Sequence, residues 1–421
     1  MESKSANWHL AAGARYDIVL YGATGFLGRQ LFAYLIKNSP KELRWAIAGR
    51  NQTKLEALST QGFKAGRAVD ILLADSHDQP AVEAMVAQAR IIVNTTGPYS
   101  INGALIVDAC VRLRRHYIDA TGETPWVRDL IDRYHERAAR EGTLIIPCCG
   151  FASAPSDLGV YLAARTLQNP GRNTSLSLKI KAYYRLSGGV SGGTLASGYN
   201  LHAMKQADRM ADHYLLTPEI PANSGVIADT DDPAFPYYDP GIDSWVGPLH
   251  HLGRINTRVT RRSADIFSQW GSSYGPEFSY QEFEKFEGFF SAVLAASTVV
   301  GMALIDCAMR FAPTRRLMAS ILRQPGDGPS ERKLDAGWFQ CEILGLASDG
   351  KQARLMISDC GDPGVRTTAK ILAESALTLV AGVEPLPNNR PRGGVLTPAT
   401  ALGERLIERL GRAGMRFQTL V

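Results

Sequence analysis

The sequence of 421 residues is short of cysteine and has no marked excess of either charge. No C-x-x-C pair and no Cys/His spacing typical of metal ligands occurs, so we expect reduced thiols, a cytoplasmic protein and no metal. A net charge of +5, scattered along the chain, argues against nucleic-acid binding. The first fifteen residues lack the hydrophobic core of a signal peptide, so secretion is not expected. The six cysteines are Cys110, Cys148, Cys149, Cys307, Cys341 and Cys360.

One catalytic pair is also missing. Short-chain dehydrogenases polarise a carbonyl with a tyrosine and a lysine four residues apart on one helix. No tyrosine in this chain has a lysine four residues later. This absence argues against the Ser-Tyr-Lys mechanism.

A glycine-rich turn near the start of the chain is the strongest motif present. The apolar run Ile18-Val-Leu-Tyr21 predicts a buried strand, and Gly22, Gly25 and Gly28 follow at G-x-x-G-x-x-G spacing. Glycine allows a tight turn, close approach of backbone to a pyrophosphate, and packing of the next helix on the strand. The helix that begins near Phe26 directs its free N–H groups at the phosphates. We therefore expect a dinucleotide site that includes Gly22, Thr24, Gly25, Phe26, Leu27 and Gly28.

The residue after the second predicted strand selects the form of the dinucleotide. Leu43–Ala48 predicts a strand that ends in Gly49-Arg50, where NAD sites usually place an acidic residue. A guanidinium at that position suits a 2′-phosphate through charge-assisted hydrogen bonds. We therefore predict NADPH as the cofactor, with Arg50 at its 2′-phosphate.

Strand-like and helix-like segments alternate up to about residue 150. This alternation predicts an α/β fold, a Rossmann-type doubly wound parallel sheet with helices on both faces. Ligands in such sheets lie beyond the carboxyl ends of the strands. That edge adds Asp75 and the run Thr95-Thr96-Gly97 with Tyr99 to the expected cofactor contacts, although Gly97-Pro98 could equally be an ordinary turn.

Several later segments have both a structural and a functional interpretation. Glu123 and Asp119 could bind ribose or cap a helix, and Thr124 and Ser156 both precede expected helices as N-caps. Beyond residue 177 the pattern changes to antiparallel strands, with a strand pair expected around Ser348-Asp-Gly350. The glycine-rich stretch Ser187–Thr194 could close over a substrate or form a flexible hairpin. Residues 218–240 predict a long surface loop, and helices are expected at 367–381 and 398–410.

The stretch from Gly288 to Ile305 contains 18 residues without a charge. That length is near the minimum for crossing a bilayer, and Arg310, Arg315 and Arg316 follow closely. Its content of Ala, Ser, Thr and Gly keeps the hydrophobicity modest. A buried helix, an interface helix, a helix at a membrane surface and a true span therefore remain alternatives.

Together these motifs carry a family resemblance. The chain resembles the saccharopine-dehydrogenase-like oxidoreductases, and among them most the trans-acting enoyl reductases of mycobacterial polyketide-lipid synthesis. The likeness extends from about residue 16 to beyond 390. The matching stretches are Tyr16–Phe26, Ala48-Gly-Arg50, Gly97-Pro-Tyr99, Tyr117–Glu123, Cys149-Gly-Phe151 with Ser153 and Pro155-Ser-Asp157, Ser187-Gly-Gly, Ser191–Thr194, Asn256–Ser263 and Gly394–Ala399.

The resemblance implies three regions and a reaction. We expect an NADP-binding domain at 15–160, an α+β domain for substrate binding and oligomerisation at 161–365, and helices at 366–421 that return to the first domain. The implied reaction is reduction of the enoyl double bond of a polyketide or fatty-acyl thioester carried on a synthase or acyl-carrier domain. Tyr99, Ser153 and Ser191 are catalytic candidates by position only. The family commonly has Asp where this chain has Ala152, which weakens a catalytic role for that turn.

Two other functions stay open. One is a saccharopine reductase-like imine oxidoreductase, which would need a cationic pocket for carboxylates. The other is a lipid-associated NADP-binding protein without turnover, attached through residues 288–305. The expected partners are an acyl-carrier or synthase domain, an acyl substrate, a membrane surface at 288–305 with peripheral attachment, and a second copy in a homodimer.

Overall fold

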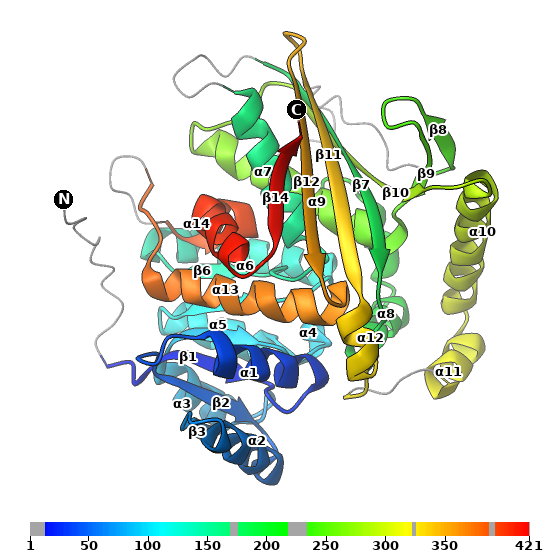
Figure 1. Cartoon of the computed structure of the whole chain (residues 1–421). Coiled ribbons are helices and arrows are strands. Elements are labelled where there is room, and N and C mark those ends of the chain that lie inside the picture. Colours follow the sequence, from blue (N-terminus) through cyan, green and yellow to red (C-terminus); the bar gives the residue numbers. More distant parts are fainter. Residues whose placement is uncertain (1–12, 169–175, 218–233, 322–325, 387–391, 421) are drawn as a thin grey trace.

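The computed structural model describes residues 13–168, 176–217, 234–321, 326–386 and 392–420. Two seven-stranded sheets organise these residues. In Figure 1 the first sheet lies in the lower half of the molecule and the long strands of the second sheet rise above it. Helix α13 (Thr368–Ala381) crosses between the two halves.

The first sheet is parallel throughout, with strand order β3-β2-β1-β4-β5-β6-β13. All six residues of its strand Tyr16–Tyr21 are buried. Ile18 and Leu20 enter one core cluster, and Val19 and Tyr21 enter the other, because successive strand side chains point to opposite faces. The strands are β1 (Tyr16–Tyr21), β2 (Trp45–Gly49), β3 (Asp70–Leu73), β4 (Ala89–Asn94), β5 (His116–Asp119), β6 (Leu144–Ile146) and β13 (Gly394–Val395).

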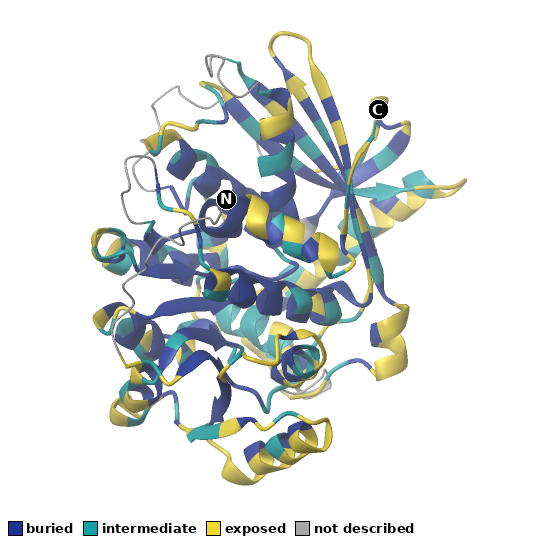
Figure 2. Cartoon of the chain, turned by 60° about the vertical axis from the view of Figure 1, so that its left-hand side comes forward, coloured by how far each residue is buried: buried dark blue, intermediate teal, exposed yellow. Residues whose placement is uncertain are grey.

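Helices cover both faces of this sheet, and Figure 2 shows the buried strands between helices with exposed outer faces. The first face carries α1 (Phe26–Asn38), α2 (Gln52–Lys64) and α13. The second carries α3 (Gln79–Ala87), α5 (Ala104–Arg112) and α6 (Thr124–Glu141). Strand order reverses between β1 and β4, so the carboxyl ends of these two strands form the crevice in which such folds bind ligands.

The second sheet is mixed, with order β14-β12-β11-β7-β10-β9-β8. Strands β7 and β10 run parallel, and the other neighbours run antiparallel. Helices α7 (Ala154–Leu167) and α9 (His250–Gln269) pack on it. The strands are β7 (Leu178–Ser187), β8 (Tyr237–Asp239), β9 (Ser244–Pro248), β10 (Phe278–Phe286), β11 (Trp338–Ala347), β12 (Gln352–Cys360) and β14 (Arg416–Leu420).

The remaining elements border the gap between the two sheets or lie at the surface. Figure 1 shows α10 and α11 at one margin of the molecule, beside α8. These elements are α4 (Tyr99–Asn102), α8 (Gly192–Ala203), η1 (Ala207–Ala211), α10 (Ser291–Arg310), α11 (Ala312–Ile321), α12 (Glu331–Ala336), η2 (Pro363–Thr367) and α14 (Pro398–Arg412).

The α/β class, the alternation up to residue 150, the β11–β12 pair and the last two helices are confirmed. The final segment does more than return as helices, because β13 extends the first sheet and β14 forms an edge of the second. The loop predicted at 218–240 lies mostly outside the described residues, and its last part forms β8.

Two predicted helix caps are wrong by one to three residues. Helix α6 begins at Thr124 itself, so Glu123 occupies the N-cap position. Helix α7 begins at Ala154, and Ser156 lies inside it with its hydroxyl 2.5 Å from the Tyr184 hydroxyl. In both helices a proline occupies the second position. Pro125 lies one residue later in α6 than expected, and Pro155 was expected before α7 rather than inside it, since proline is tolerated throughout the first turn.

Candidate functional site

A cavity of about 1410 Å³ begins at the switch point of the first sheet and reaches α10. Single-ligand pockets commonly measure about 300–1,000 Å³, so this cavity has room for a dinucleotide and a second molecule. We name its two parts. The glycine-turn end comprises residues 22–27, Arg50 and 95–99, and the helical end comprises the cavity-facing residues of α8, α9, α10 and α11.

The glycine turn has the shape that the sequence predicted. Gly22 has a φ of +80°, and a Cβ atom there would lie 2.9 Å from Thr95 Oγ1. A Cβ on Gly28 would lie 2.2 Å from the Gly22 carbonyl oxygen, so only glycine lets α1 start this close to β1. Gly25 caps α1 without a side-chain hydrogen bond, which leaves the first N–H groups of the helix available to phosphate.

Two cations flank the turn. Arg50 follows β2 directly, is exposed and lines the cavity, as does Lys54 on the first turn of α2. Among the described residues neither side chain forms an ion pair with a carboxylate, so both remain available to an anionic ligand. The sequence reasoning named Arg50 and missed Lys54, although its position four residues later was a usable signal.

Thr95 and Thr96 line the cavity, but their hydroxyl groups are engaged within the protein. Thr95 Oγ1 donates to the carbonyl oxygens of Tyr21, at 2.9 Å, and Gly22, at 3.1 Å. The Thr96 hydroxyl donates to the side chain of Asn94. Both residues therefore shape the turn, and what they offer to a cofactor is backbone and methyl surface.

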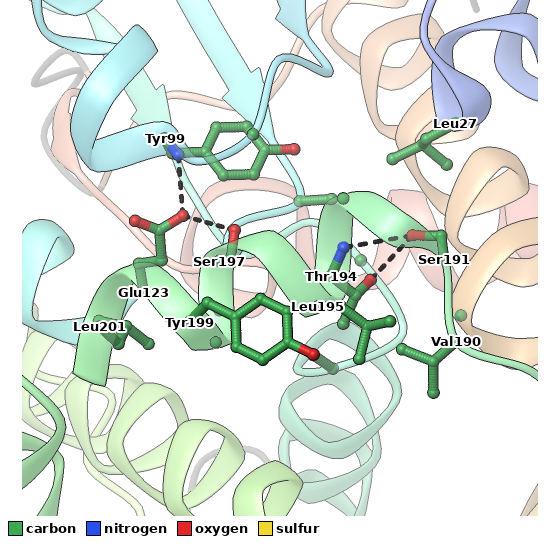
Figure 3. Close-up of a pocket in the computed structure, with 18 of the residues that line it drawn as sticks. Leu27, Tyr99, Glu123, Val190, Ser191, Thr194, Leu195, Ser197, Tyr199 and Leu201 are labelled. Carbon is green, nitrogen blue, oxygen red and sulfur yellow. Dashed lines mark hydrogen bonds between the residues drawn. The ribbon is translucent and has the colours of Figure 1, made fainter. Parts of the chain in front are cut away.

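Tyr99 lies where β4 gives way to α4, and it lines the cavity although it is buried. Its ring stacks on Trp126 with 6.1 Å between ring centroids. Burial raises the pKa of Tyr99 well above its usual value, so the hydroxyl stays protonated at neutral pH and can donate a hydrogen bond. Figure 3 shows the Tyr99 hydroxyl at the end of the side chain that points away from Glu123.

The carboxylate of Glu123 joins two segments that are distant in the sequence. It accepts hydrogen bonds from the backbone N–H groups of Tyr99, at 2.8 Å, and Ser100, at 3.1 Å. It also accepts a 2.8 Å bond from the Ser197 hydroxyl on α8 (Figure 3). Glu123 is buried and borders the cavity, and these bonds hold α8 over the 97–100 turn, whereas binding of ribose by Glu123 stays a prediction.

The glycine-rich stretch after β7 is neither a hairpin nor a free loop. Gly192 and Gly193 begin α8, and the Ser191 hydroxyl caps the helix by accepting from the Thr194 N–H at 3.3 Å. Gly189, two residues before Ser191, donates its N–H to the Asp362 carboxylate. Ser191 lines the cavity, and a catalytic role for it stays a prediction.

Three expected site residues lie off the cavity wall. Ser153 is fully buried at the start of α7 and does not line the cavity, so the structure gives no support to its catalytic role, which stays a prediction. Gly28 acts through packing of α1 rather than contact. The Asp75 carboxylate accepts from the His77 N–H at 3.0 Å, and its neighbour Ser76 lines the cavity in its place.

The helical end is mainly apolar, with a small charged cluster. Sequence reasoning missed its members on α8, which the Ser197–Glu123 and Asn200–Ser100 hydrogen bonds hold at the cavity. His251 lies 3.2 Å from Asp306, and this contact lowers the pKa of Asp306. The apolar and aromatic members on these helices are Leu195, Tyr199, Leu201, Leu252, Ile255, Met302, Ile305, Met309 and Met318.

Comparison with known proteins agrees with this geometry. Residues 18–146 match the model of the saccharopine dehydrogenase NADP binding domain. A Mycobacterium tuberculosis protein named trans-acting enoyl reductase is 33% identical over 422 residues, which cover 97% of this chain and 98% of that protein.

This chain belongs to the saccharopine dehydrogenase-like family, in the trans-acting enoyl reductase group. A Mycobacterium ulcerans member of the group is 30% identical over 96% of this chain and 98% of its own length. Among solved structures, yeast saccharopine dehydrogenase is similar over 96% of this chain and 100% of its own, with 12% identity and a TM-score of 0.49.

As a member of this family the chain is an NADPH-dependent oxidoreductase. The glycine turn, the uncapped start of α1 and the cations after β2 fit NADPH, and a Cβ at Gly22 or Gly28 would block the turn. The assignment of Arg50 to the 2′-phosphate stays a prediction. Within the residues that the structure describes, no cluster of three or more His, Cys, Asp or Glu side chains could hold a metal ion.

Proposed function

We propose that this chain reduces the enoyl double bond of an acyl thioester that a carrier or synthase domain presents to it in lipid biosynthesis. The observation that carries the proposal is the continuous cavity from the glycine turn to the methionines of α10. Its size exceeds the needs of a dinucleotide alone, and its helical end is lined by apolar side chains that match an acyl chain. The M. tuberculosis and M. ulcerans relatives, which are named trans-acting enoyl reductases, support the same reaction.

NADPH supplies the hydride for such a reduction when it is bound. The chain's own residues position the acyl group and stabilise the negative charge that develops on the thioester oxygen. Tyr99 is the best-placed donor, because its hydroxyl stays protonated and its ring is fixed against Trp126. Tyr199 is a second donor candidate, since its hydroxyl oxygen is buried without a partner among the described residues.

A steady-state assay tests the reaction. NADPH oxidation should occur with enoyl-CoA thioesters and enoyl-carrier adducts, increase with chain length because longer chains fill the helical end, and not occur with the matching saturated thioesters. Tyr99→Phe should lower turnover about 100-fold, since it removes one donor to developing negative charge. Tyr134→Phe is the matched control, because that hydroxyl lies 3.3 Å from Asp108 and off the cavity wall. No NADPH consumption with any enoyl thioester contradicts the proposal.

An imine of the lysine-pathway type is the second candidate, because Lys205, Arg254 and Arg310 also line the cavity and could hold carboxylates. Adding that imine to the panel separates the two reactions. Consumption with the imine alone would assign the saccharopine reductase-like activity, and binding of NADPH without turnover would favour a non-catalytic protein. The cytoplasmic location and a homodimer stay predictions.

A further inference from the structure

The helix α10 leaves a large apolar surface uncovered. It is long and apolar enough to cross a membrane, with a mean hydropathy of 1.9 over its best 18-residue window, yet only 11% of that window is buried. Phe289, just before it, is 96% exposed, and Val300 and Leu304 are 59% and 66% exposed. The alternative of a buried helix at 288–305 is therefore wrong, since only Ala295 and Met309 of α10 are buried.

The two faces of α10 meet different surroundings. At about 100° per residue, Val293, Val300 and Leu304 share one exposed face, and Met302 and Met309 lie on the opposite face. The methionines line the cavity. The helix is therefore a wall one helix thick between the cavity and the outside.

Contacts with the protein favour a surface arrangement of α10 over a spanning one. Helix α10 packs against β9, β10, α8 and α11, so it lies along the side of the protein rather than projecting from it (Figure 1). A helix in this position can place one face in the headgroup and acyl boundary of a bilayer and keep the other on the protein.

Positive charge gathers at one end of the exposed face. The side chain of Arg310 is 71% exposed, and Arg316 on α11 is exposed. At the other end, Glu287 is paired with Arg185 at 2.9 Å, so its charge is offset. Arg310 forms a long ion pair of 3.9 Å with the exposed Asp208. An apolar face bordered by exposed arginine side chains complements acyl chains bordered by phosphate groups.

We propose that α10 and α11 dock on the surface of an anionic phospholipid bilayer through Phe289, Phe290, Val293, Val300 and Leu304, with Arg310 and Arg316 at the lipid phosphates. A protein partner fits this face less well. Protein interfaces carry about one hydrogen bond per 100–200 Å², whereas the one hydroxyl on this face, that of Ser297, already donates to the Leu294 carbonyl oxygen at 2.9 Å.

Docking in this way would set the cavity wall against the bilayer. An acyl chain dissolved in the membrane could then reach the helical end with little exposure to water. This consequence rests on the proposed function, whereas the docking does not, and the test below therefore needs no turnover.

Two exposed cysteines make a matched experiment. Cys307 lies on the exposed face of α10 and Cys360 at the end of β12, and the other four cysteines are buried. With an environment-sensitive dye on Cys307 in a Cys360→Ser chain, phosphatidylcholine vesicles containing phosphatidylglycerol should shift the emission to the blue. The same dye on Cys360 in a Cys307→Ser chain should not respond. An equal response at both sites, or none at Cys307, overturns the proposal.

Vesicle flotation gives a second readout. The double variant Val300→Asp, Leu304→Asp should reduce the vesicle-bound fraction at least about tenfold, since it removes apolar burial and adds charge at the lipid face. Phe63→Asp, at another strongly exposed apolar residue, is the control and should float like the wild type. Unchanged NADPH affinity shows that each variant is folded. If the wild type does not float, and the double variant instead loses a dimer in sedimentation or loses carrier binding, a protein covers this face and the membrane proposal is wrong.

Discussion

The two ends of the cavity are built in opposite ways. The glycine-turn end extends from buried strands, and its backbone is so close-packed that neither Gly22 nor the adjoining Gly28 has room for a Cβ. The helical end consists of half-exposed helices with long methionine side chains and open space around its glycines. Methionine adapts to irregular shapes, and close-packed backbone does not. The rigid end therefore fits a ligand of constant shape, the cofactor. Under the proposed function, the adaptable end fits acyl chains that vary in shape.

The largest test of this contrast is a pair of glycine substitutions. Gly28→Ala should destabilise the protein by about 3 kcal/mol or more and abolish NADPH binding, because the new Cβ meets the Gly22 carbonyl. Gly301→Ala on α10 has nothing within 4 Å of its Cβ and should raise stability by about 0.5–1 kcal/mol. Chemical denaturation and NADPH titration check both. Similar effects of the two substitutions would remove the contrast.

The next largest effect concerns the hydrogen bonds by which Glu123 joins the glycine-turn end to α8 at the helical end. Glu123→Ala leaves the buried N–H groups of Tyr99 and Ser100 without acceptors and should cost about 3 kcal/mol. It should also speed hydrogen exchange in α8. Ser197→Ala removes only the bond to α8 and should cost about 1 kcal/mol with a similar gain in exchange. Unchanged exchange of α8 in both variants would show that Glu123 does not hold that helix.

Arg50→Ala tests the cofactor preference of the glycine-turn end. Hydrogen bonds to a charged group contribute about 1.5–3 kcal/mol, so NADPH should bind about 10- to 100-fold more weakly, with NADH binding unchanged. Isothermal titration of both nucleotides measures the difference. Arg15→Ala, at an exposed arginine paired with Asp70 and off the cavity wall, is the control. Equal losses of NADPH and NADH affinity would contradict a 2′-phosphate contact.

The smallest expected effect is a difference in how stability depends on pH, between the buried acid Asp157 and the partly exposed acid Asp306. Burial raises the pKa of Asp157 from 3.8 to about 7, although its carboxylate accepts from the Ala399 N–H at 2.7 Å and from Ser263. Between these values the folded chain keeps a proton that the unfolded chain has lost, so the free energy of unfolding falls as pH rises. Asp157→Asn should remove this slope, on the order of 2 kcal/mol between pH 4 and 7.

Asp306 at the helical end is the matched acid. Its hydrogen bond with His251 lowers its pKa, so its contribution is present above the ordinary aspartate value and is lost as pH falls. Asp306→Asn should therefore change stability in the opposite direction with pH, by a smaller amount because the pair is partly exposed. Urea unfolding between pH 3 and pH 8 distinguishes the two variants, because the Asp306 contribution is lost below about pH 4 and the Asp157 slope lies between about pH 4 and 7. If the free energy of unfolding changes with pH in the same way in both variants, the raised pKa of Asp157 is contradicted.

Local sequence patterns were enough to predict the parallel sheet that binds the nucleotide and NADPH as its cofactor. The strand β1, the turn after it and the start of α1 are contiguous, so spacing alone predicts their geometry. Lys54 and Ser76 were missed beside predicted neighbours, and Ser153, a predicted catalytic residue, is buried off the cavity wall. A serine at a helix start gives the same pattern whether it faces a cavity or the core.

The sequence by itself determined the parallel sheet, the glycine turn, the cofactor and the existence of an uncharged helix near residue 300. Only the tertiary structure decided that α8 closes over the turn, that Ser153 is buried, and that α10 has the cavity on one side and an uncovered face on the other. The physical reason is the distance along the sequence between the residues that interact. A glycine turn is specified by neighbours a few residues apart, whereas the Glu123–Ser197 bond joins residues 74 positions apart and depends on how the two sheets meet.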